Sequence, residues 1–251
     1  MPSPTFAWRA ARVADVRLYV VGTDTGVGKT RVTAALAFAH TRALAHDVAK
    51  PPPTIVKLVQ TGLAPGVSGD AEYAANIADS ARHYANGVAD ASQTPWRELA
   101  RFLEPADPWN AALAAGVEPL TIGPLAAALD ALAGDLIVEG SGGAAVPLDA
   151  THSISEVARE ANCEAVIVVG LRLGCINHAL LTLQYLARLG MPVRGAITTE
   201  AFGPVTHAYR DQVERALVAK DLSTALIAWD SDAARSVAGS AAHLTPFLEN
   251  R

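Results

Sequence analysis

The chain has few cysteines, no long apolar run and no excess of positive charge. Cys163 and Cys175 are its only cysteines, and without metal-ligand spacing they predict neither a metal site nor a disulfide framework. A reducing compartment, the cytoplasm, is therefore expected. No stretch reaches about 18 uncharged apolar residues, so no membrane span is predicted. The formal net charge of −5 implies no basic face, which argues against nucleic acid as a partner.

What the chain does have is length and short hydrophobic runs. Its 251 residues, 51% of them hydrophobic, suffice for one large α/β domain. Apolar and β-branched runs predict strands at 17–22, 54–62, 135–143, 164–170, 192–199 and 225–229. Ala- and Leu-rich runs predict helices at 28–45, 121–134, 152–161, 175–189 and 207–219, with one more near the C-terminus. The stretch 70–118 is mostly helical in composition and is broken by prolines.

Strands that are apolar throughout and alternate with helices indicate a parallel sheet buried on both faces. We therefore predict an α/β fold, with a single doubly wound, mostly parallel sheet and helices on both faces. Residues 17–251 are expected to form this one domain, and residues 1–16 a flexible N-terminal extension. Ligands bind such sheets at the carboxyl ends of the strands, so the loops that follow the strands should converge on one site.

Residues 22–30, GTDTGVGKT, follow the first predicted strand and open the first predicted helix. A strand, a glycine-rich turn and a helix N-terminus together aim backbone N–H groups at one hollow, which suits a phosphate chain. Thr23 stands where the strict pattern has its first glycine, so the loop is a variant within the phosphate-loop NTPase type. The predicted phosphate-binding residues are Gly26, Val27, Gly28, Lys29 and Thr30; the last also offers its hydroxyl to Mg²⁺.

Three charged residues outside this loop are candidates for the same site. Glu139 ends an apolar strand directly before GSGG, a placement that favours a Mg²⁺ ligand over a merely solvated acid. Asp70 opens a predicted helix, and its spacing leaves a metal ligand and an ordinary N-terminal helix acid equally open. Lys57 interrupts an apolar strand. It either reaches a charged partner in the site, which we favour, or faces water on an edge strand.

Four motifs in this order, GTDTGVGKT, KLVQTG, VEGSGG and VGLRLGCINHALLT, resemble the dethiobiotin synthetases of biotin biosynthesis. The resemblance covers residues 17 to about 200. It implies an ATP-dependent ligase, acting in three steps. One amine of 7,8-diaminopelargonate captures CO₂ as a carbamate, ATP phosphorylates the carbamate, and the second amine closes a ureido ring and releases phosphate.

The resemblance also implies roles for individual residues. Lys29 and Lys57 would be the catalytic residues, because their charges, with Mg²⁺, cancel the repulsion between carbamate and γ-phosphate. The metal ligands would be Thr30, Asp70 and Glu139. Thr25, Lys57 and Thr61 would border the amines and carbamate. The substrate carboxylate would be received across the interface of a homodimer by Gly174, Cys175, Ile176 and Asn177.

Some positions depart from the family pattern. Leu58 stands where the family has a proline after the strand lysine. Asp107 and Trp109 stand where it has serine and histidine beside the alkyl chain of the substrate. An asparagine that contacts the nucleotide base is replaced by Thr199, followed by Glu200, and these two residues are the predicted base contacts.

A second interpretation is a nucleotide-switch ATPase of the partitioning or septum-placement type. Such proteins share the expected fold and a variant phosphate loop. They typically carry a second lysine early in the loop, where this chain has Thr23, Asp24 and Thr25. The sequence therefore favours the ligase.

Overall fold

The protein is described here by a computed structural model, which covers residues 15–43, 51–86 and 93–248. The N-terminal extension predicted for residues 1–16 lies almost wholly outside these ranges, so the proposed division at residue 17 stays a prediction. Among the residues that the model covers, no helix is long and apolar enough to cross a membrane.

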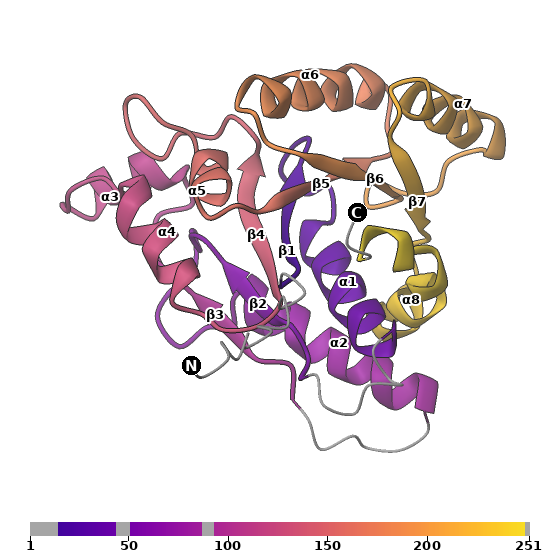
Figure 1. Cartoon of the computed structure of the whole chain (residues 1–251), viewed down its shortest axis with the longest axis horizontal. Helices are drawn as coiled ribbons and strands as arrows, with labels where there is room; N and C mark the ends of the chain where they lie inside the picture. Colours follow the sequence, from indigo (N-terminus) through magenta and orange to yellow (C-terminus); the bar gives the residue numbers. More distant parts are fainter. Residues whose placement is uncertain (1–14, 44–50, 87–92, 249–251) are drawn as a thin grey trace, which may run out of the picture.

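A seven-stranded sheet forms the centre of the molecule, with the order β3-β2-β4-β1-β5-β6-β7 (Figure 1). All six pairs of neighbouring strands are parallel, which confirms the predicted sheet type. The described strands are β1 (Arg17–Gly22), β2 (Thr54–Lys57), β3 (Trp96–Glu98), β4 (Leu136–Gly143), β5 (Glu164–Gly170), β6 (Val193–Thr199) and β7 (Ser223–Ile227).

Helices cover both faces of the sheet, as doubly wound folds require. One face packs against α1 (Lys29–Ala43), α2 (Asp70–Asn86) and α8 (Ala233–Ser240). The other packs against α4 (Ile122–Asp130), α5 (Ile154–Glu160), α6 (Cys175–Arg188) and α7 (His207–Val218). The short helix α3 (Pro108–Ala114) follows β3, and the turns η1 (Ala241–His243) and η2 (Thr245–Phe247) end the described chain. Both faces are buried, which explains why the strands are apolar throughout.

Alternation along β1 shows how one strand serves both cores. Leu18 and Val20 belong to the α1 side, whereas Tyr19 and Val21 belong to the α5 side, because successive strand residues point to opposite faces. All four side chains are buried. The central strand therefore anchors the loop that follows it between two packed layers.

The structure corrects several predicted elements. The strand predicted over 54–62 ends at Lys57, and the helix predicted over 121–134 spans only Ile122–Asp130. The stretch 70–118 is not mostly helical throughout, because β3 lies inside it. The β3 sequence WRE has no apolar pattern, and as an edge strand it needs none. Of the helix predicted over 28–45, the last two residues lie outside the described ranges.

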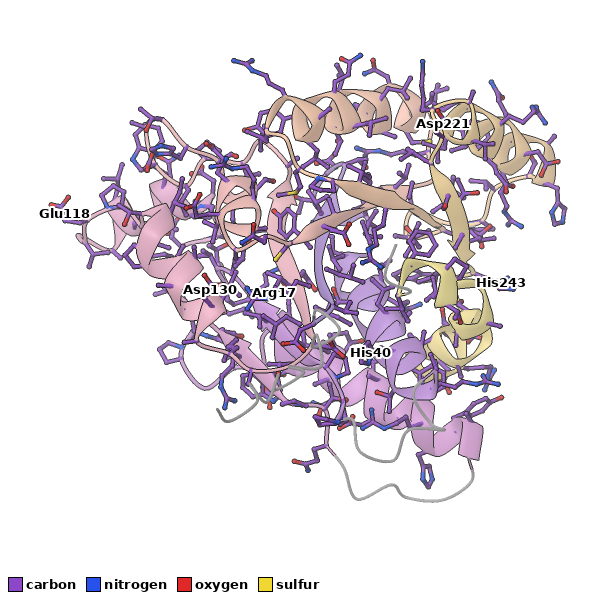
Figure 2. The ribbon with its side chains drawn as sticks, in the orientation of Figure 1. Arg17, His40, Glu118, Asp130, Asp221 and His243 are labelled. Carbon is purple, nitrogen blue, oxygen red and sulfur yellow. The ribbon has the colours of Figure 1, made fainter. Side chains whose placement is uncertain are left out.

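Two polar pairs lie at the amino ends of β1 and β4. Arg17 at the start of β1 pairs with Asp130 at the end of α4, and Figure 2 shows the two side by side. His40, near the end of α1, lies 2.8 Å from Asp135, directly before β4 (Figure 2). These contacts occupy the edge of the sheet opposite to the phosphate loop. The carboxyl edge is left for ligands, as expected for this fold.

Candidate active site

The phosphate loop connects β1 to α1 through residues with left-handed backbone. Gly26 and Gly28 have φ angles of 75° and 93°, which only glycine adopts without strain. Gly22 has no room for a side chain, because a Cβ there would come within 2.7 Å of the Asp24 carbonyl oxygen and 2.9 Å of the Lys29 ammonium. The glycines of GTDTGVGKT therefore allow the tight loop that the sequence predicts.

Lys29 is the first residue of α1 and is almost fully buried. Its ammonium donates a hydrogen bond to the Asp24 carbonyl oxygen at 3.1 Å. Burial lowers the pKa of Lys29 to about 8, and the field of Glu139 opposes this effect only in part. A phosphate chain placed beside this ammonium would stabilise its charged form.

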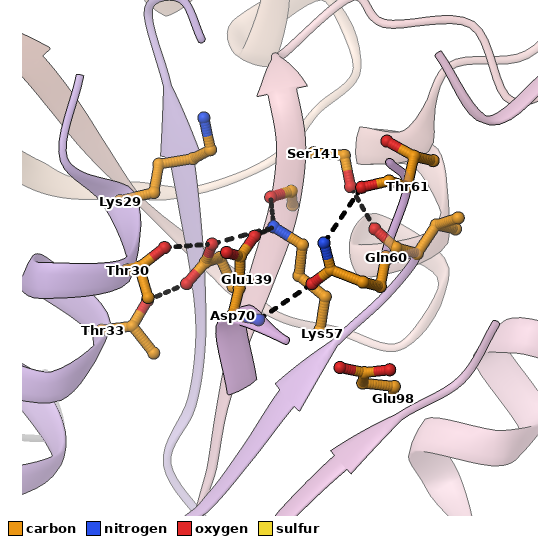
Figure 3. Close-up of polar contacts among 12 residues, drawn as sticks. Lys29, Thr30, Thr33, Lys57, Gln60, Thr61, Asp70, Glu98, Glu139 and Ser141 are labelled. Carbon is orange, nitrogen blue, oxygen red and sulfur yellow. Dashed lines mark hydrogen bonds and ion pairs between the residues drawn. The ribbon is translucent and has the colours of Figure 1, made fainter. Parts of the chain in front are cut away.

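Glu139 forms the centre of the polar site (Figure 3). It lies inside β4 and does not end an apolar strand as predicted, because the strand continues through the glycine-rich segment to Gly143. Its carboxylate is fully buried and accepts three hydrogen bonds. Thr30 Oγ1 donates to Oε1 at 3.1 Å, Thr33 Oγ1 donates to Oε2 at 2.9 Å, and Lys57 Nζ donates to Oε1 at 2.9 Å. A buried carboxylate is stable only with such partners. Glu139 therefore joins α1, β2 and β4 at one point.

Lys57 is paired with Glu139 by strand register, because the two are direct partners in the parallel β2–β4 ladder. Its ammonium also lies 2.6 Å from Asp70 Oδ2 and donates to the Gly140 carbonyl oxygen at 3.1 Å. Burial alone would lower the pKa of Lys57, but attraction to Glu139 and Asp70 outweighs burial and raises it. Lys57 is thus a charged residue inside the site, and the alternative of a solvated edge-strand lysine is wrong for this structure.

Asp70 is held at the N-terminus of α2 by Gln60. The Gln60 side-chain oxygen accepts the Asp70 backbone N–H at 2.9 Å, while its amide donates to the Thr61 carbonyl oxygen (Figure 3). Gly69 packs so closely that a Cβ there would collide with the Glu98 carboxylate. Asp70 is therefore a first-turn helix acid that also contributes a charge to the site, and its role as a metal ligand stays a prediction.

A cavity of about 720 Å³ opens between the phosphate loop and this cluster. Most of the residues predicted for phosphate, metal and amine contacts line it together: Thr25, Gly26, Gly28, Lys29, Thr30, Lys57, Thr61, Asp70 and Glu139. Val27 lies apart from them and is buried, with its carbonyl oxygen bound by Thr199. The cavity thus combines two ammonium groups, three carboxylates, those of Asp70, Asp107 and Glu139, and the start of α1.

Known proteins match this chain over most of its length. The family model described as an AAA domain matches residues 16–222. An ATP-dependent dethiobiotin synthetase of Frankia casuarinae is 36% identical over 185 residues, covering 72% of this chain and 69% of that protein. The synthetase of Anaeromyxobacter dehalogenans is 32% identical over 223 residues, covering 87% and 92%.

The chain belongs to the dethiobiotin synthetase family. The resemblance carried by its four sequence motifs is thereby confirmed. A synthetase of Rhodococcus jostii, 38% identical over 72% of this chain and 71% of its own length, supports the same assignment. These relatives are ATP-dependent synthetases, that is, ligase-type enzymes.

Solved structures agree on the fold. The MinC–MinD cell division complex of Aquifex aeolicus has a TM-score of 0.55 at 12% identity, with 95% of this chain and 97% of that chain covered. The cell division ATPase MinD of Pyrococcus furiosus has a TM-score of 0.53 at 16% identity, with 92% and 99% covered. At these identities the likeness shows only that this chain shares the overall fold of these proteins.

The loop predicted to receive the substrate carboxylate lies elsewhere. Among the described residues that line the cavity, none comes from 174–177. Gly174 has a φ of 92° and precedes α6, and Cys175 is buried with its sulfur 3.5 Å from the Tyr209 hydroxyl. Ile176 is half-buried and Asn177 is exposed. These four residues could serve a second chain, and this role stays a prediction.

The two predicted base contacts already have partners. Thr199 is fully buried and donates its hydroxyl to the Val27 carbonyl oxygen at 2.6 Å. Glu200 forms an ion pair with Arg210 at 2.5 Å. The Thr199 contact ties β6 to the phosphate loop. Base recognition by Thr199 and Glu200 therefore stays a prediction that these contacts do not support.

The departures from the family pattern fall in different places. Leu58 is fully buried in the core on the α5 side, where its side chain adds apolar contact. Asp107 lines the cavity and caps α3 by accepting the Asn110 backbone N–H at 3.0 Å. Trp109 is half-buried and lies outside the set of residues that line the cavity. Only Asp107 thus changes the chemistry of the cavity wall.

Sequence reasoning missed Thr33, Gln60 and Ser141. Thr33 lies three residues after Thr30, on the same side of α1, and this helical spacing is the signal that could have found it. Gln60 and Ser141 line the cavity from the loop after β2 and from the end of β4. Ser141 donates to the Val59 carbonyl oxygen and so ties these two segments together.

The donor set fits a hard divalent cation such as Mg²⁺, which prefers carboxylate and hydroxyl oxygens. Asp70 and Glu139 supply carboxylate oxygens around the point at which the Lys57 ammonium lies, and the Thr30 hydroxyl donates a hydrogen bond to Glu139 beside it. Across the described residues, no group of three or more His, Cys, Asp or Glu side chains could hold a metal. Two carboxylates and a hydroxyl suit an ion that takes its remaining ligands from phosphates and water.

Proposed function

We propose that the chain catalyses the ATP- and Mg²⁺-dependent carboxylation and ring closure of 7,8-diaminopelargonate with CO₂, which yields dethiobiotin. The observation that carries this proposal is the meeting of Lys57 with the phosphate-loop Lys29 in one cavity. Phosphate binding alone needs only Lys29. A second buried ammonium beside it suits a reaction between two anions, a carbamate and a γ-phosphate.

The proposed reaction has three steps: carboxylation, phosphorylation and ring closure. A neutral amine of the substrate adds to the carbon of CO₂ and loses a proton, which gives a carbamate. A carbamate oxygen attacks the γ-phosphorus of ATP, and ADP leaves, which gives a carbamic–phosphoric anhydride. The second amine attacks the carbonyl carbon and loses a proton, the ureido ring closes, and phosphate leaves. Amines and carbamate are nucleophilic when correctly oriented, so positioning supplies much of the rate.

The residues of the cavity have distinct roles in this scheme. Lys29 binds the β- and γ-phosphate oxygens, where negative charge increases during transfer. Lys57, held at the end of β2, orients the carbamate and offsets its charge. Thr30, Asp70 and Glu139 would hold Mg²⁺, which neutralises phosphate charge when bound. Thr25 and Thr61, which both line the cavity, border the amines.

We further propose a homodimer in which residues 174–177 of one chain bind the substrate carboxylate of the other. Two observations support it. These residues lie apart from the cavity of their own chain. The adjoining surface is apolar, because Leu173 is 93% and Leu181 of α6 is 56% exposed. Exposed leucines near a helix N-terminus suit a two-fold interface that places an anion-binding helix end near the neighbouring site.

The experiment is incubation of the protein with diaminopelargonate, bicarbonate, Mg²⁺ and ATP, followed by detection of dethiobiotin by mass. We expect product that depends on all four components and is lost in Lys29→Ala. The competing function, a nucleotide-switch ATPase, predicts ATP hydrolysis that is indifferent to diaminopelargonate. Hydrolysis of that kind without dethiobiotin would overturn the proposal.

A further inference from the structure

We infer that Lys57 acts as an internal counter-cation that competes with the divalent metal for the same two carboxylates. The metal therefore binds well only when it arrives with the nucleotide, whose phosphates give Lys57 new partners. This inference rests on the metal site of the proposed function. It adds that metal binding depends on nucleotide binding, because the chain without nucleotide would bind the metal poorly.

The contacts of the Lys57 ammonium carry the argument. It lies 2.6 Å from Asp70 Oδ2, 2.9 Å from Glu139 Oε1 and 3.1 Å from the Gly140 carbonyl oxygen. An ammonium has three N–H donors, and these three described acceptors suffice for all of them. Two of the three acceptors are the carboxylates that would ligate Mg²⁺. The ammonium is therefore bound much as a small cation would be.

A divalent ion cannot share these oxygens with the ammonium. Mg²⁺ binds oxygen at about 2.0–2.1 Å, so an ion on Asp70 and Glu139 would lie within a few ångströms of Lys57 Nζ. Both groups are cations, and Lys57 and Glu139 are buried, where screening is weak. One of the two must leave. Metal alone would leave a buried ammonium without carboxylate partners, whereas a metal–nucleotide complex supplies phosphate oxygens in exchange.

The choice of lysine fits this exchange. The chain has only four lysines, at positions 29, 50, 57 and 220, among its 20 lysine and arginine residues. A lysine head is a compact charge on a flexible stem, so it can leave one set of oxygens for another a short distance away. The planar guanidinium of arginine would bind the carboxylates in a more rigid geometry.

The first test measures Mn²⁺ binding to the full chain without nucleotide, by the loss of the free-ion EPR signal. Lys57→Met removes the competing charge and should tighten Mn²⁺ binding at least tenfold. Lys220→Met is the control: Lys220 is exposed after α7 and does not line the cavity, so the Mn²⁺ affinity of this variant should stay within about threefold of that of the unaltered chain. Mn²⁺ affinity in folded Lys57→Met equal to or weaker than that of the unaltered chain would overturn the inference.

The second test uses the unaltered protein and so does not depend on how the variant folds. Lysine is labelled with ¹³C at Cε, and the Lys57 signal among the four is assigned with Lys57→Arg. Mg²⁺ alone at millimolar concentration should leave this signal in place, and Mg²⁺ with a non-hydrolysable ATP analogue should shift it. A signal that Mg²⁺ alone moves, or that the complex leaves unchanged, contradicts the exchange.

The two proposals fail in different ways. If both tests show that Lys57 leaves the carboxylates for the nucleotide, but the protein makes no dethiobiotin, the proposed function is wrong and the inference about Lys57 holds. Dethiobiotin formation by the unaltered protein, with Lys57→Met binding Mn²⁺ no better than the control, would sink the exchange and leave the proposed function standing.

Discussion

The carboxyl edge of the sheet has two dissimilar halves. On the β2–β4–β1 side, buried charged groups meet at a cavity, and Lys57 joins two carboxylates there. On the β5–β6–β7 side, the polar groups are already paired: Thr199 with the Val27 carbonyl oxygen and Glu200 with Arg210. Both halves follow parallel strands of one sheet. The charges of the first half line the cavity beside the phosphate loop, whereas a separate cavity on the β6–β7 side is lined by Arg210 and Glu214 among others.

This difference separates a half built for chemistry from a half built for support. Buried charges that line a cavity are costly unless a ligand or a partner uses them, so they mark function. The hydrogen bond from Thr199 of β6 to the Val27 carbonyl oxygen instead holds the phosphate loop in place. Residues 174–177 follow β5 and have neither role: they do not line this cavity, and they are predicted to serve the cavity of a second chain. The predictions below test this division.

The largest expected effect is at Lys29, in the chemical half. Lys29→Ala should lower kcat/KM for dethiobiotin formation by about a hundredfold or more, because it removes roughly 3 kcal/mol or more of transition-state stabilisation. Lys220, which is exposed after α7, provides the control as Lys220→Ala and should change nothing. The measurement is the rate of dethiobiotin formation by each variant, followed by mass detection of the product. Near-native turnover in Lys29→Ala would remove the phosphate loop from the chemistry.

The next effect is at Glu139. Glu139→Gln keeps the shape but removes the charge from a metal ligand, so the Mg²⁺ concentration for half-maximal rate should rise about tenfold. It also takes one carboxylate partner from Lys57, so the free energy of unfolding should fall by about 1–3 kcal/mol. Mg²⁺ titrations and thermal melts measure the two effects. An unchanged titration would place the metal elsewhere.

Mixing two inactive variants tests residues 174–177, which have neither role. Lys29→Ala and Asn177→Ala damage different parts of a shared site, so a hybrid dimer keeps one intact site. Random mixing should restore about a quarter of the original activity, since half of the dimers are hybrids with one good site each. The measurement is activity against mixing ratio. A monomeric mass in solution at full activity would rule out the shared site.

A smaller effect is expected at Thr33, which sequence reasoning missed. Thr33→Val removes the hydroxyl that binds Glu139 Oε2 and keeps the volume, so Mg²⁺ half-saturation should rise about three- to tenfold with little change in kcat. Thr33→Ser retains the hydroxyl and should restore the original value. If the serine and valine variants behave alike, packing and not the hydrogen bond is what matters.

The smallest effect concerns nucleotide choice, in the supporting half. Thr199→Val breaks the hydrogen bond to Val27 and should weaken all nucleoside triphosphates alike, with the ratio of ATP to CTP kcat/KM changed less than about twofold. Parallel titrations of ATP, CTP, GTP and UTP provide the data. A tenfold change in the ratio would mean that Thr199 reads the base after all.

The candidate site could be predicted in part because its elements are local. The loop GTDTGVGKT, the acid after the apolar run of β4 and the lysine at the end of β2 are each visible within a few residues. What could not be predicted is how they meet. β3 has no apolar pattern, yet by pairing with β2 it turns that strand into an internal one and buries Lys57. Gln60 acts by accepting a hydrogen bond from the Asp70 backbone. Thr33 acts by donating one to Glu139, which lies 106 residues away in the chain.

The sequence by itself determined the alternation of strands and helices, the phosphate loop and its family, because these depend on local patterns of apolar residues and glycines. The tertiary structure alone decided that Lys57 stands between Asp70 and Glu139, since strand register and the start of α2 bring together residues that lie 13 and 82 positions from Lys57. It also decided that Thr199 supports the loop and that residues 174–177 lie apart from the cavity. Such choices follow from packing between distant segments, which no local pattern encodes.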